Sequence, residues 1–406
     1  MKLPIHTPIF FRCPPLKSYN PGGDASDSSQ KARSLFPAPP AGGRDSRPFW
    51  TAGIFFSALS VILTFCARTL PGFAQRYAVT VYPVLAGTLG RFCSLFPLSL
   101  SEAGLYILIL FSLYYLCRNI KKPLRVLSRG FMICSCLLFL YTVNCGINYY
   151  RNPFSYEAGM VMEKSSTEDL YRLCAYLIDQ INASIEPAEH TEGPLKGLYP
   201  GQTEDTPLPS PADLRAMGIA GQEAMEGLGE QFPQLKGFYP YPKPLMGPRL
   251  LSVQQLCGIY SPFTIEANYN REMPYYNIPH TICHELSHLK GFMREDEANF
   301  IGYMACIGSQ SPDFRYSGYL MGWVYAGNAL AKVDLEAYYE LHSRLKPEAV
   351  KDLVWNNQFW DRFDGKVAEA SNQLNDRYLK ANSQEDGVRS YGRMVDLMLA
   401  YYKDRL

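Results

Sequence analysis

The sequence has no excess of charge, and it lacks the cysteine spacing of a thiolate metal site. Its 406 residues carry a formal net charge of +1. A chain so close to neutrality has no electrostatic basis for holding nucleic acid, and no basic stripe interleaved with aromatics is present. The cysteines of the C-terminal part show no C-x-x-C spacing, which favours packing roles, although pairing among them stays open. We therefore expect no nucleic-acid partner.

The first 48 residues lack apolar periodicity. They are rich in Pro, Gly and Ser, with scattered Lys and Arg. Such a composition buries too little apolar surface to offset the entropy of folding. We therefore expect residues 1–48 to form a disordered tail, not a signal peptide.

Three long apolar runs follow this tail, over residues 49–67, 98–117 and 131–149. Each is about as long as a helix must be to cross the hydrocarbon core of a bilayer. None carries a central Lys or Arg. The runs therefore predict three transmembrane helices, and membrane lipid as a partner.

Basic residues are dense in the tail and between the second and third runs, and sparse between the first and second. The two loops carry Arg118, Lys121, Lys122, Arg125 and Arg129 against Arg68, Arg76 and Arg91. Because cytoplasmic loops favour Lys and Arg, we expect a cytoplasmic tail, a membrane domain over residues 49–150 and an extracytoplasmic domain over residues 151–406. Residues 77–97 are apolar enough to lie in the interface, where Pro83 and Arg91 argue against a fourth crossing.

The segment that carries the most chemistry contains H-E-x-x-H. On a helix, His284 and His288 lie on one face and can offer two imidazoles to one zinc ion. Glu285 stands beside them, where it can act as the general base toward a water molecule. Pro279 suits the first turn of such a helix and Gly291 its end.

A catalytic zinc usually has three protein ligands. Arg294 stands where a metzincin would carry its third histidine, and arginine cannot bind zinc. The segment Glu295-Asp-Glu-Ala-Asn299 instead resembles the E-x-x-A-[DN] helix of gluzincins. That resemblance implies Glu295 as the third ligand, with Glu297 as the alternative. Asn299 would then hydrogen-bond a ligating histidine.

The predicted fold class is α+β and mainly helical, with a small sheet before the H-E-x-x-H helix. Helical patterns cover residues 165–184, 211–228, 299–307, 317–345, 347–375 and 387–405. Strand composition covers residues 250–270, in which Pro262 favours an edge strand. The edge strand of a zincin-like domain would pair with an extended substrate.

Three further residues are candidates for roles at the site. Glu266, at the end of the expected edge strand, resembles the glutamate with which zinc aminopeptidases hold the substrate amine. An ion pair with a Lys or Arg is the alternative. Tyr316 and Tyr319 could donate a hydrogen bond to a tetrahedral oxyanion, although core packing is also open to them.

The chain after residue 51 is similar to a family of bacterial membrane proteins of unknown function, mostly from Firmicutes, that is predicted to be zincin-like. Segments 258–268, 284–299, 315–317 and 390–396 carry the similarity. The resemblance implies a multi-pass protein of the bacterial cytoplasmic membrane. The chain departs from the family pattern at Ile265, where a glycine is expected.

Together these features favour a membrane-anchored zinc metallopeptidase with one zinc ion, which hydrolyses peptide or protein substrates outside the membrane. An intramembrane protease is excluded because charged residues flank the motif. The alternative is a zincin-fold sensor or scaffold of the cell envelope that binds zinc without turnover. Glu285 argues against it, since a structural zinc site needs no general base.

Overall fold

The structure is a computed structural model that describes residues 46–185, 200–382, 384, 387 and 393–406. Within these residues the chain is mainly helical and has one three-stranded sheet. The predicted fold class is confirmed at this level. The tail expected to be disordered lies almost wholly outside the described residues.

Three helices are long and apolar enough to cross a membrane: α1 (Arg47–Thr69), α4 (Leu100–Asn119) and α5 (Pro123–Asn144). The first two agree with the predicted runs. The third begins earlier than predicted because Pro123 opens the helix at its first turn. Arg125 and Arg129, expected in a loop, are therefore helical, and only residues 120–122 connect α4 to α5.

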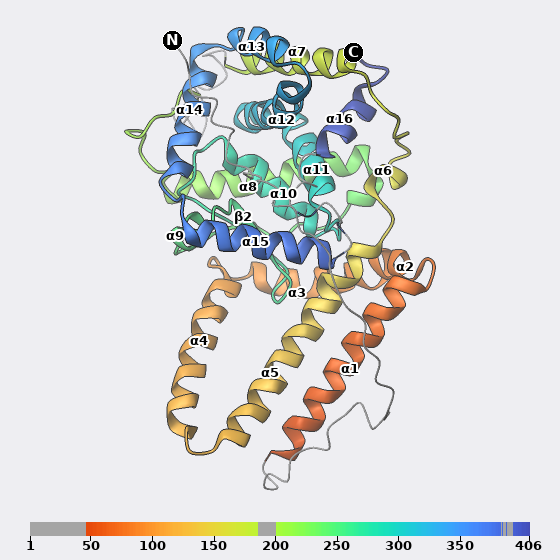
Figure 1. Ribbon diagram of the computed structural model, residues 1–406, viewed down its shortest axis with the longest axis vertical. Coiled ribbons are helices and arrows are strands. Elements are labelled where there is room, and N and C mark those ends of the chain that lie inside the picture. The colour runs from red at the N-terminus through yellow and green to blue at the C-terminus, as the bar shows by residue number, and fades with distance from the viewer. Residues whose placement is uncertain (1–45, 186–199, 383, 385–386, 388–392) are drawn as a thin grey trace, which may run out of the picture.

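Two short helices, α2 (Phe73–Thr80) and α3 (Tyr82–Ser94), follow α1. They lie across the ends of α1, α4 and α5, between these helices and the rest of the chain (Figure 1). Neither approaches the roughly 20 residues that a crossing helix needs. Residues 77–97 therefore do not form a fourth crossing helix.

The rest of the chain forms a helical domain around a small sheet. Its helices are η1 (Gly146–Tyr150), α6 (Phe154–Glu157), α7 (Thr167–Ser184), α8 (Pro211–Gln231), η2 (Pro233–Leu235), α9 (Arg249–Ser252), α10 (Asn277–His288), α11 (Glu295–Ile307), α12 (Pro312–Val333), α13 (Leu335–Ser343), α14 (Pro347–Asp361), α15 (Lys366–Ala381) and α16 (Met394–Tyr402). Ser166 and Ser210 begin α7 and α8 with capping boxes. Residues 317–345 and 347–375, each predicted as one helix, are each divided in two, because Asp334 and Gly365 adopt non-helical conformations.

The sheet contains β1 (Lys243–Pro244), β2 (Gly258–Ser261) and β3 (Glu266–Tyr269), in the order β1-β3-β2. β3 runs parallel to β1 and antiparallel to β2. β2, which precedes Pro262, is an edge strand as predicted. The placement of Glu266 at the end of that edge strand is wrong, since Glu266 begins the central strand β3.

Polar contacts connect the C-terminal end of α15 to the membrane-proximal part. The hydroxyl of Tyr378 on α15 accepts hydrogen bonds from Tyr149 at 3.1 Å and Tyr141 at 3.4 Å. Arg68, near the end of α1, donates to the carbonyl of Ala381 at 3.0 Å. The C-terminal end of α15 therefore contacts the ends of α1 and α5.

Ile265, the residue that departs from the family pattern, has a left-handed backbone. Its φ is +51°, and its side chain is fully buried in the tight connection between β2 and β3. A β-branched residue in this region is strained by about 1–2 kcal/mol, a cost that glycine avoids. The left-handed backbone explains why a glycine is expected at this position.

We expect Ile265→Gly to be more stable than Ile265→Ala by about 1 kcal/mol, because both variants lose the same burial and only glycine relieves the backbone. Thermal unfolding of the two variants measures the difference. The control is Ile181, buried in helix α7, where alanine should be the more stable replacement. Equal rank orders at the two sites would contradict the strain at Ile265.

Candidate metal centre

The candidate centre lies between α10 and α11. The chain reverses after α10 at Gly291, whose φ is +81° and whose N–H donates to the carbonyl of His288 at 2.9 Å. Gly302 lets the two helices approach closely, since a Cβ there would stand 3.1 Å from the backbone nitrogen of His284. This close packing brings the first turn of α11 opposite the histidines of α10.

His284, His288 and Glu295 converge in this space. One possible ligand atom from each lies within 4.8 Å of the others. His284 Nε2 is 3.2 Å from the Glu295 carboxylate. Two imidazole nitrogens and a carboxylate oxygen are a ligand set that suits zinc. Of the two acids considered for the third position, the structure brings Glu295 to the histidines.

The other nitrogen of each imidazole has an acceptor. His284 Nδ1 donates to Asn299 Oδ1 at 2.8 Å, and His288 Nδ1 donates to the carbonyl of Phe292 at 2.7 Å. Each Nε2 is thereby left with its lone pair for a metal. Burial lowers the pKa of both histidines to about 4, so both are neutral near pH 7. The neutral form is the one that binds metal.

Glu285 is buried beside these ligands. Burial, and then the charge of Glu295, raise the pKa of its carboxyl well above the usual value, against a backbone hydrogen bond from Tyr260. Its Oε2 has no hydrogen-bond partner among the described residues. An unpartnered buried carboxylate oxygen is costly, and water or a cation next to it would remove that cost.

A cleft of about 90 Å³ opens beside these residues. Its lining comes from the segment before and into β2, from α10, from Asn299 and from α12: Gln255, Leu256, Cys257, Gly258, His280, Thr281, His284, Glu285, Asn299, Met321 and Tyr325. β2 thus borders the cleft with its first residue.

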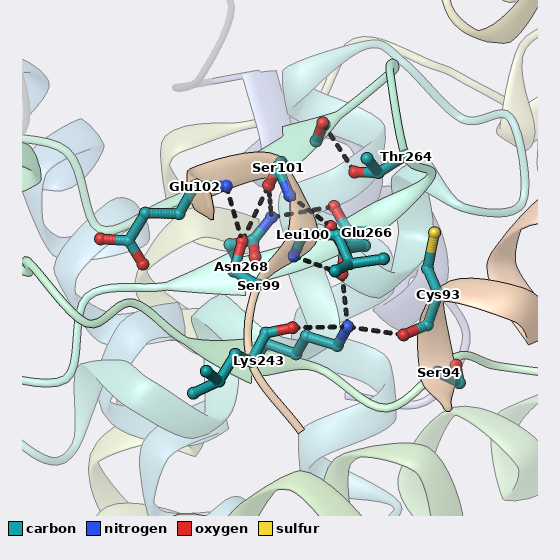
Figure 2. A network of polar contacts seen from close by, with 12 residues as sticks. Cys93, Ser94, Ser99, Leu100, Ser101, Glu102, Lys243, Thr264, Glu266 and Asn268 are labelled. Atoms are coloured by element: carbon teal, nitrogen blue, oxygen red, sulfur yellow. Dashed lines mark hydrogen bonds and ion pairs between the residues drawn. The ribbon is translucent and has the colours of Figure 1, made fainter. Parts of the chain in front are cut away.

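Glu297 and Glu266 point elsewhere. Glu297 accepts from the backbone N–H of Phe154 at 2.9 Å and from Arg294 at 3.0 Å, so it holds the chain that enters the domain. Glu266 forms a buried ion pair with Lys243 and holds no position in the cleft (Figure 2). The ion-pair alternative therefore describes Glu266, and an amine-binding role does not.

The two tyrosines considered for oxyanion binding are not at the cleft. Tyr316 is fully buried and donates to Asp352 at 2.6 Å. Tyr319 packs on the ring of Tyr176, with centroids 6.3 Å apart. Tyr325 is the tyrosine of α12 that lines the cleft, and it hydrogen-bonds the side chain of Asn299. The structure therefore does not bring Tyr316 to the cleft.

A family model described as "Protein of unknown function (DUF3810)" matches residues 77–399. The chain belongs to this family. The match includes α4, α5 and every residue of the candidate centre, but it starts later than the resemblance suggested and leaves out α1. No curated protein and no solved structure matches the chain.

Two residues that line the cleft, His280 and Tyr325, had no role assigned from the sequence. His280 lies one turn before His284, lines the cleft, and donates from Nε2 to the carbonyl of Asn299 at 3.2 Å. The i, i+4 spacing to His284 was the available signal for it. Tyr325 lies well inside α12 and is separated from the H-E-x-x-H motif by the whole of α11. No local spacing could therefore identify it.

Gly258 of the edge strand leaves no room for a side chain beside Glu285. A Cβ there would stand 2.5 Å from Glu285 Oε1 and 2.9 Å from the carbonyl of Asn268. We expect Gly258→Ala to destabilise the protein by about 1–3 kcal/mol and to displace Glu285, because the strand backbone cannot yield. The midpoint of thermal unfolding measures the destabilisation, and a structure of the variant measures the displacement of Glu285. Gly227→Ala, on the exposed face of α8 with no atom near the added methyl, should keep or raise stability.

Proposed function

We propose that the chain is a membrane-anchored, zinc-dependent metallopeptidase with a zincin-like domain of the gluzincin type. One observation carries the proposal: His284, His288 and Glu295 offer ligand atoms within 4.8 Å of one another, directly beside the buried carboxyl of Glu285. Three protein ligands with an open position are typical of catalytic zinc, whereas structural zinc is enclosed by four.

Zinc held by these three residues would supply the Lewis acidity that makes water a nucleophile near neutral pH. Glu285 would take a proton from the attacking water and deliver it to the leaving amine. The charge of a dication would favour the ionised forms of Glu285 and Glu295, against the burial that raises the pKa of Glu285. Tyr325, which lines the same cleft, would orient the substrate carbonyl.

We place the site outside the cytoplasmic membrane of a bacterium. The start of α1 and the turn between α4 and α5 lie at the end of the molecule opposite the site (Figure 1). Arg118, Lys121, Lys122 and Arg125 gather at that turn. Because cytoplasmic ends of membrane helices favour basic residues, this end would be cytoplasmic and the site extracytoplasmic.

The second candidate is a zincin-fold sensor or scaffold of the envelope without turnover. The observation that favours it is the size of the cleft, about 90 Å³, which is well below the several hundred Å³ usual for ligand sites. It predicts bound zinc and no hydrolysis.

Zinc content and hydrolysis of a fluorogenic peptide library, measured on the full chain, test the proposal. We expect about one zinc per chain, loss of zinc and of activity in His288→Ala, and reversal of chelator inhibition by added zinc. His342→Ala is the control, because His342 stacks on Trp323 and does not line the cleft. We expect this variant to bind as much zinc as the wild type. Stoichiometric zinc without hydrolysis would favour the scaffold, and a metal-free active protein would refute both.

A further inference from the structure

The sheet beside the candidate centre rests on the end of a helix long enough to cross a membrane. Asn144, the last residue of α5, donates from its side chain to the carbonyl of Pro262 at 2.7 Å. Its own carbonyl accepts from the Tyr260 hydroxyl at 2.9 Å. The end of β2 away from the cleft is therefore bonded directly to α5.

A buried charged network bonds the same sheet to α4. Glu266 accepts from the backbone N–H groups of Leu100 at 3.1 Å and Ser101 at 2.8 Å, which are orphan donors of the first turn of α4 (Figure 2). Its partner Lys243 donates to the carbonyls of Cys93 at 2.8 Å and Leu98 at 3.0 Å. Both charged side chains are only 1% exposed.

Further hydrogen bonds from Glu102 and Tyr82 join the domain to α4 and α3. Glu102 in the first turn of α4 accepts from the backbone N–H groups of Met246 and Gly247, each at 2.8 Å. The Tyr82 hydroxyl on α3 reaches the carbonyl of His288, a proposed metal ligand, at 3.2 Å. The site is thus bonded to the membrane-proximal helices through buried groups, without a flexible linker between them.

This attachment sets the height of the site. Gly258, next to Glu285, and Pro262, on the end of α5, are four residues apart along an extended chain. At about 3.3 Å per residue, Gly258 lies roughly 13 Å along the chain from Pro262, and Tyr260, whose backbone N–H donates to Glu285, lies about half as far. Glu285 is therefore within a few residues' length of the end of α5. Two large apolar side chains are exposed here, Ile259 at 46% and, directly after Pro262, Phe263 at 42%. They suit an apolar polypeptide that lies against the membrane surface.

We infer that the substrate is a polypeptide anchored in the same membrane, cut within about four to eight residues of the end of its membrane segment. This inference rests on the proposed function. The outer edge of β2 has no strand partner among the described residues, and we expect it to receive the extended segment next to the anchor through backbone groups other than the Tyr260 N–H, which donates to Glu285. The buried network holds that edge at a fixed height. A peptidase for soluble peptides would need only a flexible tether to the membrane. Here the buried Lys243–Glu266 pair bonds the sheet itself to α4.

The test uses the full chain in lipid nanodiscs with single-span probe peptides. The probes carry one cleavable sequence at 4, 8, 16 or 24 residues beyond the span, on Gly/Ser spacers, and the same sequence is also supplied as a free peptide. We expect fastest cleavage at 4 to 8 residues and at least a tenfold lower rate at 24. Dilution along a flexible tether alone accounts for only about fivefold between 8 and 24 residues.

Photocrosslinking of the same probes to Glu285→Gln protein provides a readout that needs no turnover. Labelling of β2 and α10 by the short-offset probes and not by the longer ones upholds recognition of a membrane-anchored polypeptide. If wild-type protein then cleaves nothing, the peptidase proposal and the predicted cut fail while this recognition stands. Equal cleavage of all offsets and of the free peptide overturns the inference and upholds the peptidase. Neither labelling nor cleavage overturns both.

Discussion

Glu285→Gln is expected to lower kcat for peptide hydrolysis by about 10²- to 10⁴-fold while the zinc content stays at the wild-type level. A positioned general base contributes a factor of this size, and glutamine cannot accept the proton. Glu285 is not one of the three residues whose ligand atoms converge, so its loss should spare metal binding. Steady-state kinetics and metal analysis of one preparation separate the two effects.

The replacement keeps the volume of the side chain, which matters because Gly258 leaves no spare room around Glu285. Glu336→Gln, an exposed acid in the first turn of α13, is the matched control and should leave kcat unchanged. A kcat within twofold of the wild type in Glu285→Gln would remove the general base from the proposal. Loss of zinc in that variant would show that Glu285 is a ligand.

Glu266→Gln is expected to destabilise the protein by about 3–5 kcal/mol, because it leaves the ammonium group of Lys243 buried without its anion. The two N–H groups donate to different oxygens of Glu266, and glutamine has only one acceptor oxygen, so the variant also loses the hydrogen bond from either Leu100 or Ser101. A lower midpoint of thermal unfolding in nanodiscs, at fixed pH and lipid composition, measures the destabilisation.

The double variant Lys243→Met/Glu266→Gln removes both charges and should recover at least half of that loss. Replacing a buried ion pair by uncharged side chains is often close to neutral, whereas breaking one partner is not. A single variant as stable as the wild type would contradict burial of the pair. Equal instability of the single and double variants would assign the loss to packing.

The candidate centre was predictable where a helix supplies the geometry. His284 and His288 meet because they are four residues apart, and Asn299 meets His284 because it lies one turn beyond Glu295 on α11. The choice of Glu295 over Glu297 needed the positive φ at Gly291, which sets the start of α11. The zinc itself and the reaction remain predictions.

Other features depended on tertiary contacts that no local pattern records. From the sequence, Glu266 could either bind a substrate amine or form an ion pair. The tertiary contact with Lys243 decides for the ion pair. Tyr316 and Tyr325 both lie on α12, but only Tyr325 lines the cleft, while Tyr316 contacts Asp352. The sequence alone does not show which side of α12 faces the cleft. β1 has two residues, too few to give an alternating pattern. The three membrane-spanning helices were predictable as long apolar runs, because the thickness of the bilayer sets the length that such a helix needs.

The contact between Tyr149 and Tyr378 joins residues that are 229 positions apart in the chain. A ribosome that adds about 5–20 residues per second needs roughly ten to fifty seconds to supply the second tyrosine after the first. During that time α5 has been synthesised, yet the helix whose end contacts it does not exist. These contacts can therefore form only after α15 has been synthesised, and a ribosome stalled before α15 leaves Tyr141 and Tyr149 without the hydroxyl of Tyr378.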